Sequence, residues 1–150
     1  MGERMASSLS DEQKIALFRQ MIDAWQKQEW RKVADLFTPD GILHSMMIEP
    51  VRGREALYKR FMGFSNPNKK VTLQVRRMGV VDGALLVERV DEIVLDGVTR
   101  SAPVVGVLEF EGAMISEWRE YYDRVELLCA QGKPADAQAY AAAAADRAKH

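Results

Sequence analysis

The chain has 150 residues, 47% of them hydrophobic and 29% charged, with a formal net charge of -1. Length and composition predict one globular domain with a sizeable core. The near-zero charge gives no electrostatic reason to expect nucleic acid or an anionic membrane as a partner. No apolar run approaches the roughly 18 residues of a membrane span, and residues 1–8 lack the apolar stretch of a secretory signal.

Soft metal ligands are scarce in this sequence. They are limited to His44, His150 and the single cysteine, Cys129. A zinc site is therefore not expected, and no loop has the spacing of calcium ligands. One cysteine cannot form an internal disulfide, which fits a reducing cytoplasm. We expect a cytoplasmic protein without a metal or cofactor.

Helix signals dominate the first half of the chain. Ser10 and Gln13 form a capping box, and the residues that follow have apolar side chains at helical spacing (Ile15, Phe18, Met21, Ile22 and Trp25). A short helix is expected at 30–37, a turn at 38–41 and a strand at 42–48. A third helix opens after Gly53, with apolar residues in register up to Phe64.

The second half reads as consecutive strands at 71–80, 83–95, 98–110 and 114–126. Asp82-Gly83 and Asp96-Gly97 are hairpin signals between them. Helices followed by such a meander predict an α+β fold, in which helices pack on one face of a curved antiparallel sheet.

The ends of the chain differ in composition from its middle. Residues 1–9 are expected to be a flexible tail, and residues 10–130 to form the domain. Residues 131–150 are rich in alanine after Gly132-Lys133-Pro134, which predicts a helical extension. Its small side chains bury little area, so we expect it to be peripheral.

Two strands carry charges on faces that should be apolar. Period-two alternation places Arg89 and Asp91 on the face of Leu85 and Ile93, and it places Glu120 between Trp118 and Tyr122. Such charges are unfavourable unless they are paired, and pockets that shift carboxyl pKa values are where acid–base chemistry takes place. A structural ion pair across the sheet is the alternative interpretation.

Several motifs together resemble one known family. They are Asp35-Leu36-Phe37 with Pro39-Asp40, Gly53-Arg54-Glu55-Ala56, Glu88-Arg89-Val90-Asp91, Gly106-Val107, and Ile115 with Trp118-Arg119-Glu120-Tyr121-Tyr122-Asp123. Across residues 14–126 the chain resembles the cone-shaped NTF2-like superfamily, in which helices pack on the concave face of the sheet. Within it, the chain is most similar to the limonene-1,2-epoxide hydrolase group.

The resemblance implies a cofactor-free reaction on a small hydrophobic epoxide, and a homodimer. In that group a carboxylate takes a proton from water as the water attacks an epoxide carbon, and a protonated carboxyl gives its proton to the epoxide oxygen. By match of position, Asp91 is the acid, Glu120 the base and Arg89 the arginine between them. Two carboxyls that share one arginine hold one negative charge far better than two, which suits an acid working beside a base.

The chain departs from the group where water is held. The group has an aspartate at the position of Glu120, and a tyrosine and an asparagine at those of Leu43 and Ser45. The hydroxyl of Tyr122 offers a replacement partner for the water, and Trp118 is interpreted as pocket wall or core. An isomerase or cyclase of the ketosteroid-isomerase and polyketide-cyclase type, and a noncatalytic binding module, remain alternatives.

Overall fold

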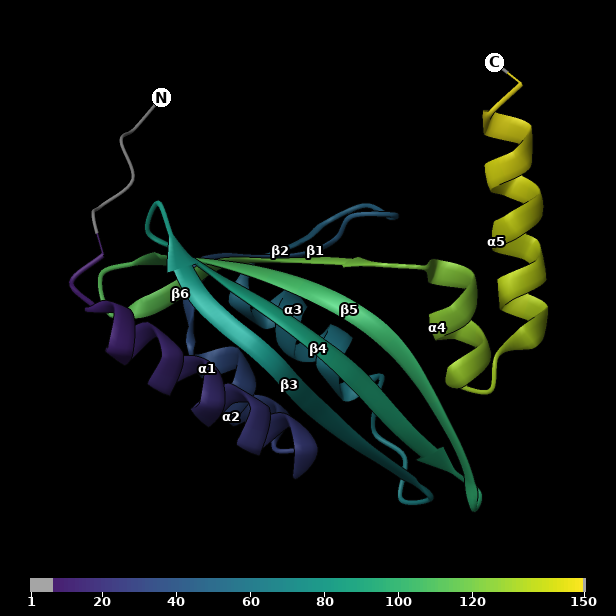
Figure 1. The fold of residues 1–150 in the computed structure, drawn as a ribbon, viewed down its shortest axis with the longest axis horizontal. Coiled ribbons are helices and arrows are strands. Elements are labelled where there is room, and N and C mark those ends of the chain that lie inside the picture. The colour runs from purple at the N-terminus through teal and green to yellow at the C-terminus, as the bar shows by residue number, and fades with distance from the viewer. Residues whose placement is uncertain (1–6, 150) are drawn as a thin grey trace.

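A computed structural model describes residues 7–149 of the chain (Figure 1). The elements run in the order α1 (Asp11–Gln26), α2 (Trp30–Asp35), β1 (Phe37–Ser45), β2 (Val51–Arg52), α3 (Arg54–Met62), β3 (Lys69–Val81), β4 (Ala84–Leu95), β5 (Val98–Glu111), β6 (Met114–Tyr122), α4 (Arg124–Ala130) and α5 (Pro134–Arg147). The predicted α+β class is confirmed.

The strands of the described residues form one six-stranded sheet in the order β2-β1-β6-β5-β4-β3. Strands β3 to β6 are the predicted antiparallel meander, and β1 joins β6 in parallel. At the two hairpin signals, Asp82 and Asp96 have φ of 50° and 52°, and the following Gly83 and Gly97 have 83° and 80°. Positive φ at both central residues suits the twist of a tight hairpin, which explains Asp-Gly at both turns.

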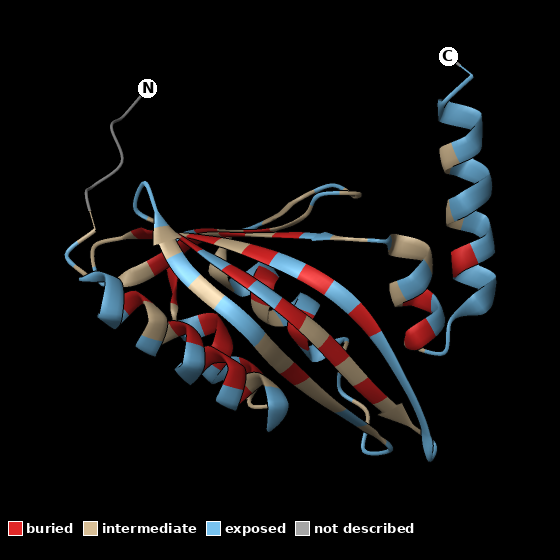
Figure 2. Ribbon diagram, viewed as in Figure 1, coloured by how far each residue is buried: buried red, intermediate tan, exposed pale blue. Residues whose placement is uncertain are grey.

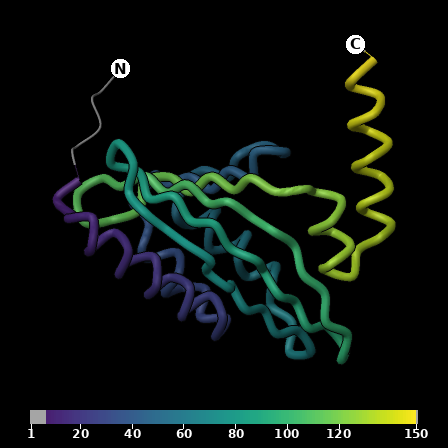
Figure 3. Tube along the Cα trace, in the orientation of Figure 1, coloured from purple at the N-terminus to yellow at the C-terminus, as the bar shows by residue number. Residues whose placement is uncertain are grey.

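The long strands bend around α1, α2 and α3, which cover the concave face of the sheet (Figures 1 and 3). Buried and exposed residues alternate along β4 and β5, as the banded ribbon of Figure 2 shows. This alternation is expected of strands that have one face on the core and one toward solvent.

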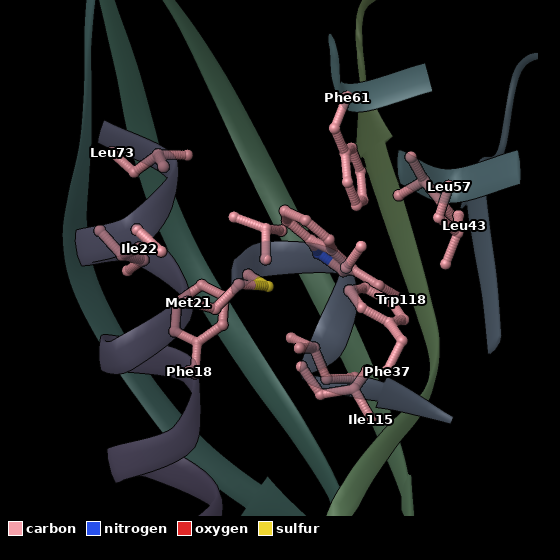
Figure 4. Close-up of a cluster of buried hydrophobic side chains, with 14 of the residues drawn as sticks. Phe18, Met21, Ile22, Phe37, Leu43, Leu57, Phe61, Leu73, Ile115 and Trp118 are labelled. Carbon is pink, nitrogen blue, oxygen red and sulfur yellow. The ribbon is translucent and has the colours of Figure 1, made fainter. Parts of the chain in front are cut away.

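Aromatic rings fill the space between the helices and the sheet. Trp25 of α1 lies with its ring centroid 5.0 Å from that of Trp30, 5.3 Å from Phe61 and 5.5 Å from Trp118. Phe18 and Met21 are fully buried on the same helix, as the capping box and spacing predicted. Figure 4 shows these α1 side chains facing Phe37, Phe61 and Trp118, so the core closes one end of the concave side.

The largest boundary differences from the sequence prediction lie at the ends of β1 and β6. The last strand ends at Tyr122 rather than at 126, because Asp123 accepts hydrogen bonds from the backbone N–H groups of Val125 and Glu126 and so starts α4. Residues 38–41 belong to β1 instead of a turn, with an irregular register before Ile42. That strand ends at Ser45, three residues earlier than expected.

The first and last described segments of the chain lie at the edge of this architecture. Residues 1–6 of the expected tail, and His150, lie outside the described residues, while Ser8 donates from its backbone N–H to Gly112 at 2.9 Å. Helix α5 is mostly exposed and packs on α4 through the buried Ala137 (Figure 2). No helix within residues 7–149 has the length and apolar character needed to cross a bilayer.

Candidate functional site

The guanidinium of Arg89 joins two carboxyl groups in the middle of the sheet. Its Nε donates to Oδ1 of Asp91 at 2.7 Å, and its Nη2 donates to Oδ2 at 3.1 Å. On the other side, Nη1 donates to Oε2 of Glu120 at 3.0 Å, and Nη2 also donates to Oε1. The structure thus brings together the three residues that the alternation pattern singled out.

The strand order explains how residues 31 positions apart meet. Arg89 and Asp91 point to the same face because they are two apart on β4. Glu120 lies on β6, so β5 separates it from Arg89. On β5, Gly106 is the residue opposite Glu120, and a Cβ there would lie 2.8 Å from Glu120 Oε2 and 3.0 Å from Arg89 Nη1. Only glycine leaves room for the arginine and the glutamate to meet across β5.

Burial controls the charge of this site. Arg89, Asp91 and Glu120 are only 3%, 8% and 7% exposed. Burial raises the pKa of Glu120 to about 7; the charge and hydrogen bonds of Arg89 oppose this rise, and the charge of Asp91 adds to it. Burial alone would lower the pKa of Arg89, but the two carboxylates raise it, so the guanidinium stays charged. The site therefore holds one proton on its carboxyl pair up to about neutral pH.

Trp118 belongs both to the core and to the site. Its side chain is 1% exposed, and its ring lies 5.6 Å from the guanidinium carbon of Arg89. The indole Nε1 makes no hydrogen bond of good geometry to any described residue, but its N–H dipole beside Glu120 still favours the charged carboxylate. Trp118 thus supports the charged pair from the core side.

The trio lines a cavity of about 560 Å³ that is also lined by aromatic and aliphatic side chains. The remaining predicted site residues line the same cavity: Leu43, Ser45, Trp118 and Tyr122. In the parallel ladder of β1 and β6, Leu43 pairs with Trp118 and Ser45 with Glu120. The structure therefore brings all seven candidate residues to the lining of one cavity.

Other cavity residues were not anticipated. The Tyr122 hydroxyl accepts a hydrogen bond from Nη1 of Arg124 at 2.7 Å, and Leu127 and Tyr140 add walls from α4 and α5. Arg124 was missed because the last strand was expected to run through residue 126. The sequence signal for the start of α4 was Asp123, a residue type favoured as a helix N-cap. Gly106 was quoted only as part of a motif, although a glycine inside a strand often marks a close approach.

Metal ligands do not gather around this cavity. Within residues 7–149, no group of three or more His, Cys, Asp or Glu side chains is arranged so that it could hold a metal ion.

A curved antiparallel meander whose concave face is covered by helices is the cone-shaped NTF2-like fold. Residues 11–133 match the family described as limonene-1,2-epoxide hydrolase catalytic domain, and the chain belongs to this family. The resemblance seen in the motifs is thereby confirmed.

Solved structures share this fold at low sequence identity. A structure of an M. tuberculosis LEH-like epoxide hydrolase is 19% identical with a TM-score of 0.69, and the match covers 80% of this chain and 85% of that one. A protein of ketosteroid isomerase-like fold from Catenulispora acidiphila is 20% identical, also with a TM-score of 0.69, and the match covers 80% and 95%. At these identities the likeness establishes the fold alone.

Proposed function

We propose that the protein is a cofactor-free hydrolase that adds water to a small hydrophobic epoxide. The observation that carries this proposal is the buried trio, in which one guanidinium holds two carboxyl groups at the wall of an apolar cavity. Because the pKa of Glu120 is raised to about 7, the pair keeps one proton near neutral pH. An acid and a base are then available in the same site.

In the proposed step, the proton that Glu120 holds first moves to Asp91, and the charged carboxylate of Glu120 then takes a proton from water. The water oxygen forms a bond to one epoxide carbon, and the bond between that carbon and the epoxide oxygen breaks. Asp91 gives its proton to the departing oxygen, so the product is a diol. After this step the proton is on Glu120 and the charge on Asp91, which is the starting state.

Water must be held beside Glu120 for this chemistry. The side chain of Leu43 has no hydrogen-bonding group, but Ser45 pairs with Glu120 in the β1–β6 ladder and lines the cavity. Tyr122 lies on the face of Glu120, and its hydroxyl accepts from Arg124, which leaves the hydroxyl proton free to donate. A positioned water needs about two to four polar partners, and we propose Glu120, Ser45 and Tyr122 for this role.

The test is turnover of a panel of cyclic and terpenoid epoxides in ¹⁸O-labelled water. We expect a diol that carries one labelled oxygen, and we expect Asp91→Asn and Glu120→Gln each to lower kcat/KM by at least about a hundredfold. The hydrolase proposal fails if the purified protein converts no epoxide above background. It also fails if both variants retain wild-type turnover.

The position of Leu43 favours a second candidate. An apolar side chain where the family holds water suits a site that moves a proton on a bound ketone rather than activating water. An isomerase or cyclase of this kind would use one carboxyl as base and the other as the acid that stabilises the enolate. Deuterium exchange into cyclic ketones at neutral pH, without epoxide turnover, would support it. If ligands bind unchanged and Asp91→Asn leaves their affinity intact, the cavity is a noncatalytic binding site.

A further inference from the structure

Beyond the trio, the lining of the cavity is strongly basic, although the protein as a whole has a net charge of -1. Outside the trio, the charged residues that line the cavity are five cations and one carboxylate, Asp136. The cations are Lys59, Arg60, Lys69, Arg124 and Lys133. They come from α3, β3, α4 and the turn before α5, so segments distant in sequence bring positive charge to one cavity.

Two of these cations lie over one aromatic ring, and the charge of a third acts on one of them. The guanidinium of Arg60 and the ammonium of Lys69 each lie 5.7 Å from the ring centroid of Phe64. Lys69 is half-buried, and this burial lowers its pKa; the nearby positive charge of Lys133 lowers it further. Like charges are thus held near one another around a surface that is partly shielded from water, which is unfavourable unless an anion joins them.

No carboxylate within residues 7–149 forms an ion pair with this cluster. None of the ion pairs formed among residues 7–149 involves Arg60, Lys69 or Lys133. Some cations elsewhere do bind carboxylates: Arg31 binds Glu55 at 2.8 Å, and Arg119 binds Glu109 at 2.6 Å. What distinguishes the cluster from other cations without an ion pair is that its members line one cavity.

An apolar path connects this cluster to the acid–base trio. Lys69, Val71 and Leu73 lie at alternate positions of β3, and all three line the cavity. Leu73 pairs with Asp91, so the path along β3 ends beside the trio. Four residues of a strand span about 13 Å, which sets the distance between the cationic end of the cavity and its reactive end.

We propose that Arg60, Lys69 and Lys133 form a subsite for the anionic group of an amphipathic substrate, a carboxylate or a phosphate. Its apolar chain lies along Val71 and Leu73, and its reacting carbons reach the trio about 13 Å away. The inference extends the proposed epoxide hydrolysis, and rests on it for the reaction but not for binding. The substrate class is then an epoxide of a medium-chain acid or phosphate ester.

Binding of unreactive ligands tests the subsite independently of catalysis. Decanoate, decyl phosphate and decanol are titrated into the wild-type protein and into the double variant Lys69→Gln/Lys133→Gln by calorimetry. We expect the double variant to weaken binding of the anionic ligands about tenfold and to leave decanol within about twofold. High salt is expected to weaken the anionic ligands in the wild type, because it screens exposed charges.

The matched control is Lys70→Gln. Lys70 is the exposed neighbour of Lys69 on β3 and does not line the cavity. Binding of all three ligands should be unchanged in this variant. Stronger binding of decanoate than of decyl phosphate, or the reverse, identifies the anion. The proposal is overturned if the double variant binds decanoate as the wild type does, or if Lys70→Gln weakens it equally.

Turnover separates the two proposals. A medium-chain epoxy acid and its methyl ester are compared as substrates, and we expect the acid to have a KM about tenfold lower. If anions bind selectively but neither epoxide reacts, the subsite stands and the hydrolase proposal fails. If both epoxides react with equal KM and decanoate binds the double variant as tightly as the wild type, the hydrolase proposal stands and the subsite is overturned.

Discussion

At the residue scale, the site depends on a glycine, Gly106, which has no side chain. The side chain of Glu120 is one methylene longer than the aspartate that the limonene-1,2-epoxide hydrolase group has at this position, and the extra length needs space. Gly106 provides it, because a Cβ at that position would lie 2.8 Å from Glu120 Oε2 and 3.2 Å from Nε1 of Trp118. The longer carboxylate and the glycine on the neighbouring strand therefore form one structural unit.

Substitution of Gly106 by alanine tests this unit. The added methyl group must push Glu120 or Arg89 away, so we expect a loss of about 1–3 kcal/mol in the free energy of unfolding. We also expect a drop of roughly a hundredfold in epoxide kcat/KM, because a catalytic group is displaced by about 1 Å. Urea denaturation and steady-state kinetics measure the two effects.

Gly79→Ala is the matched control for this substitution. Gly79 is also a strand glycine, and a Cβ there meets nothing within 4 Å. Stability and activity of this variant should equal those of the wild type or rise slightly. If the two alanine variants behave alike, Gly106 is not required for the meeting of Arg89 and Glu120.

The raised pKa of Glu120 makes a prediction about rate. The proposed reaction needs one proton on the carboxyl pair, and this proton is lost above a pKa of about 7. We therefore expect kcat/KM to fall roughly tenfold per pH unit on the alkaline side of that value. A profile that stays flat from neutral to alkaline pH would contradict the shared-proton mechanism.

The trio itself was predictable from the sequence because strand parity is a strong constraint. Charged residues at alternate positions of an otherwise apolar face leave few arrangements other than a pair in a pocket or across the sheet. The roles of Gly106 and Arg124 and the basic lining of the cavity were not predictable in this way. Their roles depend on which strands are neighbours and on where α4 begins, and neither is set by alternation within one segment.

At the element scale, β6 shows how alternating side chains place one tyrosine in the cavity and its neighbour on the opposite face of the sheet. Tyr122 faces the cavity, where its hydroxyl accepts from Arg124 at 2.7 Å, whereas the preceding residue, Tyr121, is 44% exposed on the opposite face. Adjacent tyrosines thus provide a variant and its control on one strand.

Tyr122→Phe removes the hydroxyl and keeps the ring. We expect kcat for an epoxide to fall about fivefold, because one partner of the attacking water is lost, worth roughly 1 kcal/mol. Tyr121→Phe should have wild-type kinetics. Equal kinetics for both variants, measured in parallel, would remove Tyr122 from the proposed water site.

Helix α4 depends on its first residue. The Asp123 carboxylate accepts from the N–H groups of Val125 at 2.9 Å and of Glu126 at 3.2 Å. We expect Asp123→Ala to lower the free energy of unfolding by about 1 kcal/mol, and Asp123→Asn to retain most of it, since asparagine is a comparable cap. Chemical denaturation of the three proteins checks this order. An alanine variant as stable as the wild type would show that packing alone holds α4.

The elements were mostly predictable, and the errors have one physical source. Periodicity and caps identified α1, α3 and the four long strands, because each buries a single face. The ends of β1 and β6 were misplaced because apolar residues continue past them as Met46-Met47-Ile48 and as Val125, Leu127 and Leu128. Apolar runs of this length fit either a strand or a helix, and tertiary contacts decide between them.

At the scale of the whole molecule, the site affects the stability of the fold in the direction opposite to that of an ordinary carboxylate. The pKa of Glu120 is raised from 4.5 to about 7, mainly by burial. Between these two values the folded protein binds more protons than the unfolded chain, so stability falls as pH rises. The exposed Glu55 has its pKa lowered by the hydrogen bond from Arg31, so its contribution changes only below this window.

We therefore expect the free energy of unfolding to decrease from about pH 5 to pH 7, by at most about 3 kcal/mol, and to level off above that range. Urea denaturation at a series of pH values measures this curve. Glu120→Gln replaces the titrating group with a neutral one of similar shape, so its curve should be flat over the same window. If wild type and variant have parallel curves, the buried carboxyl does not hold its proton in the folded protein, and the acid–base site loses its physical basis.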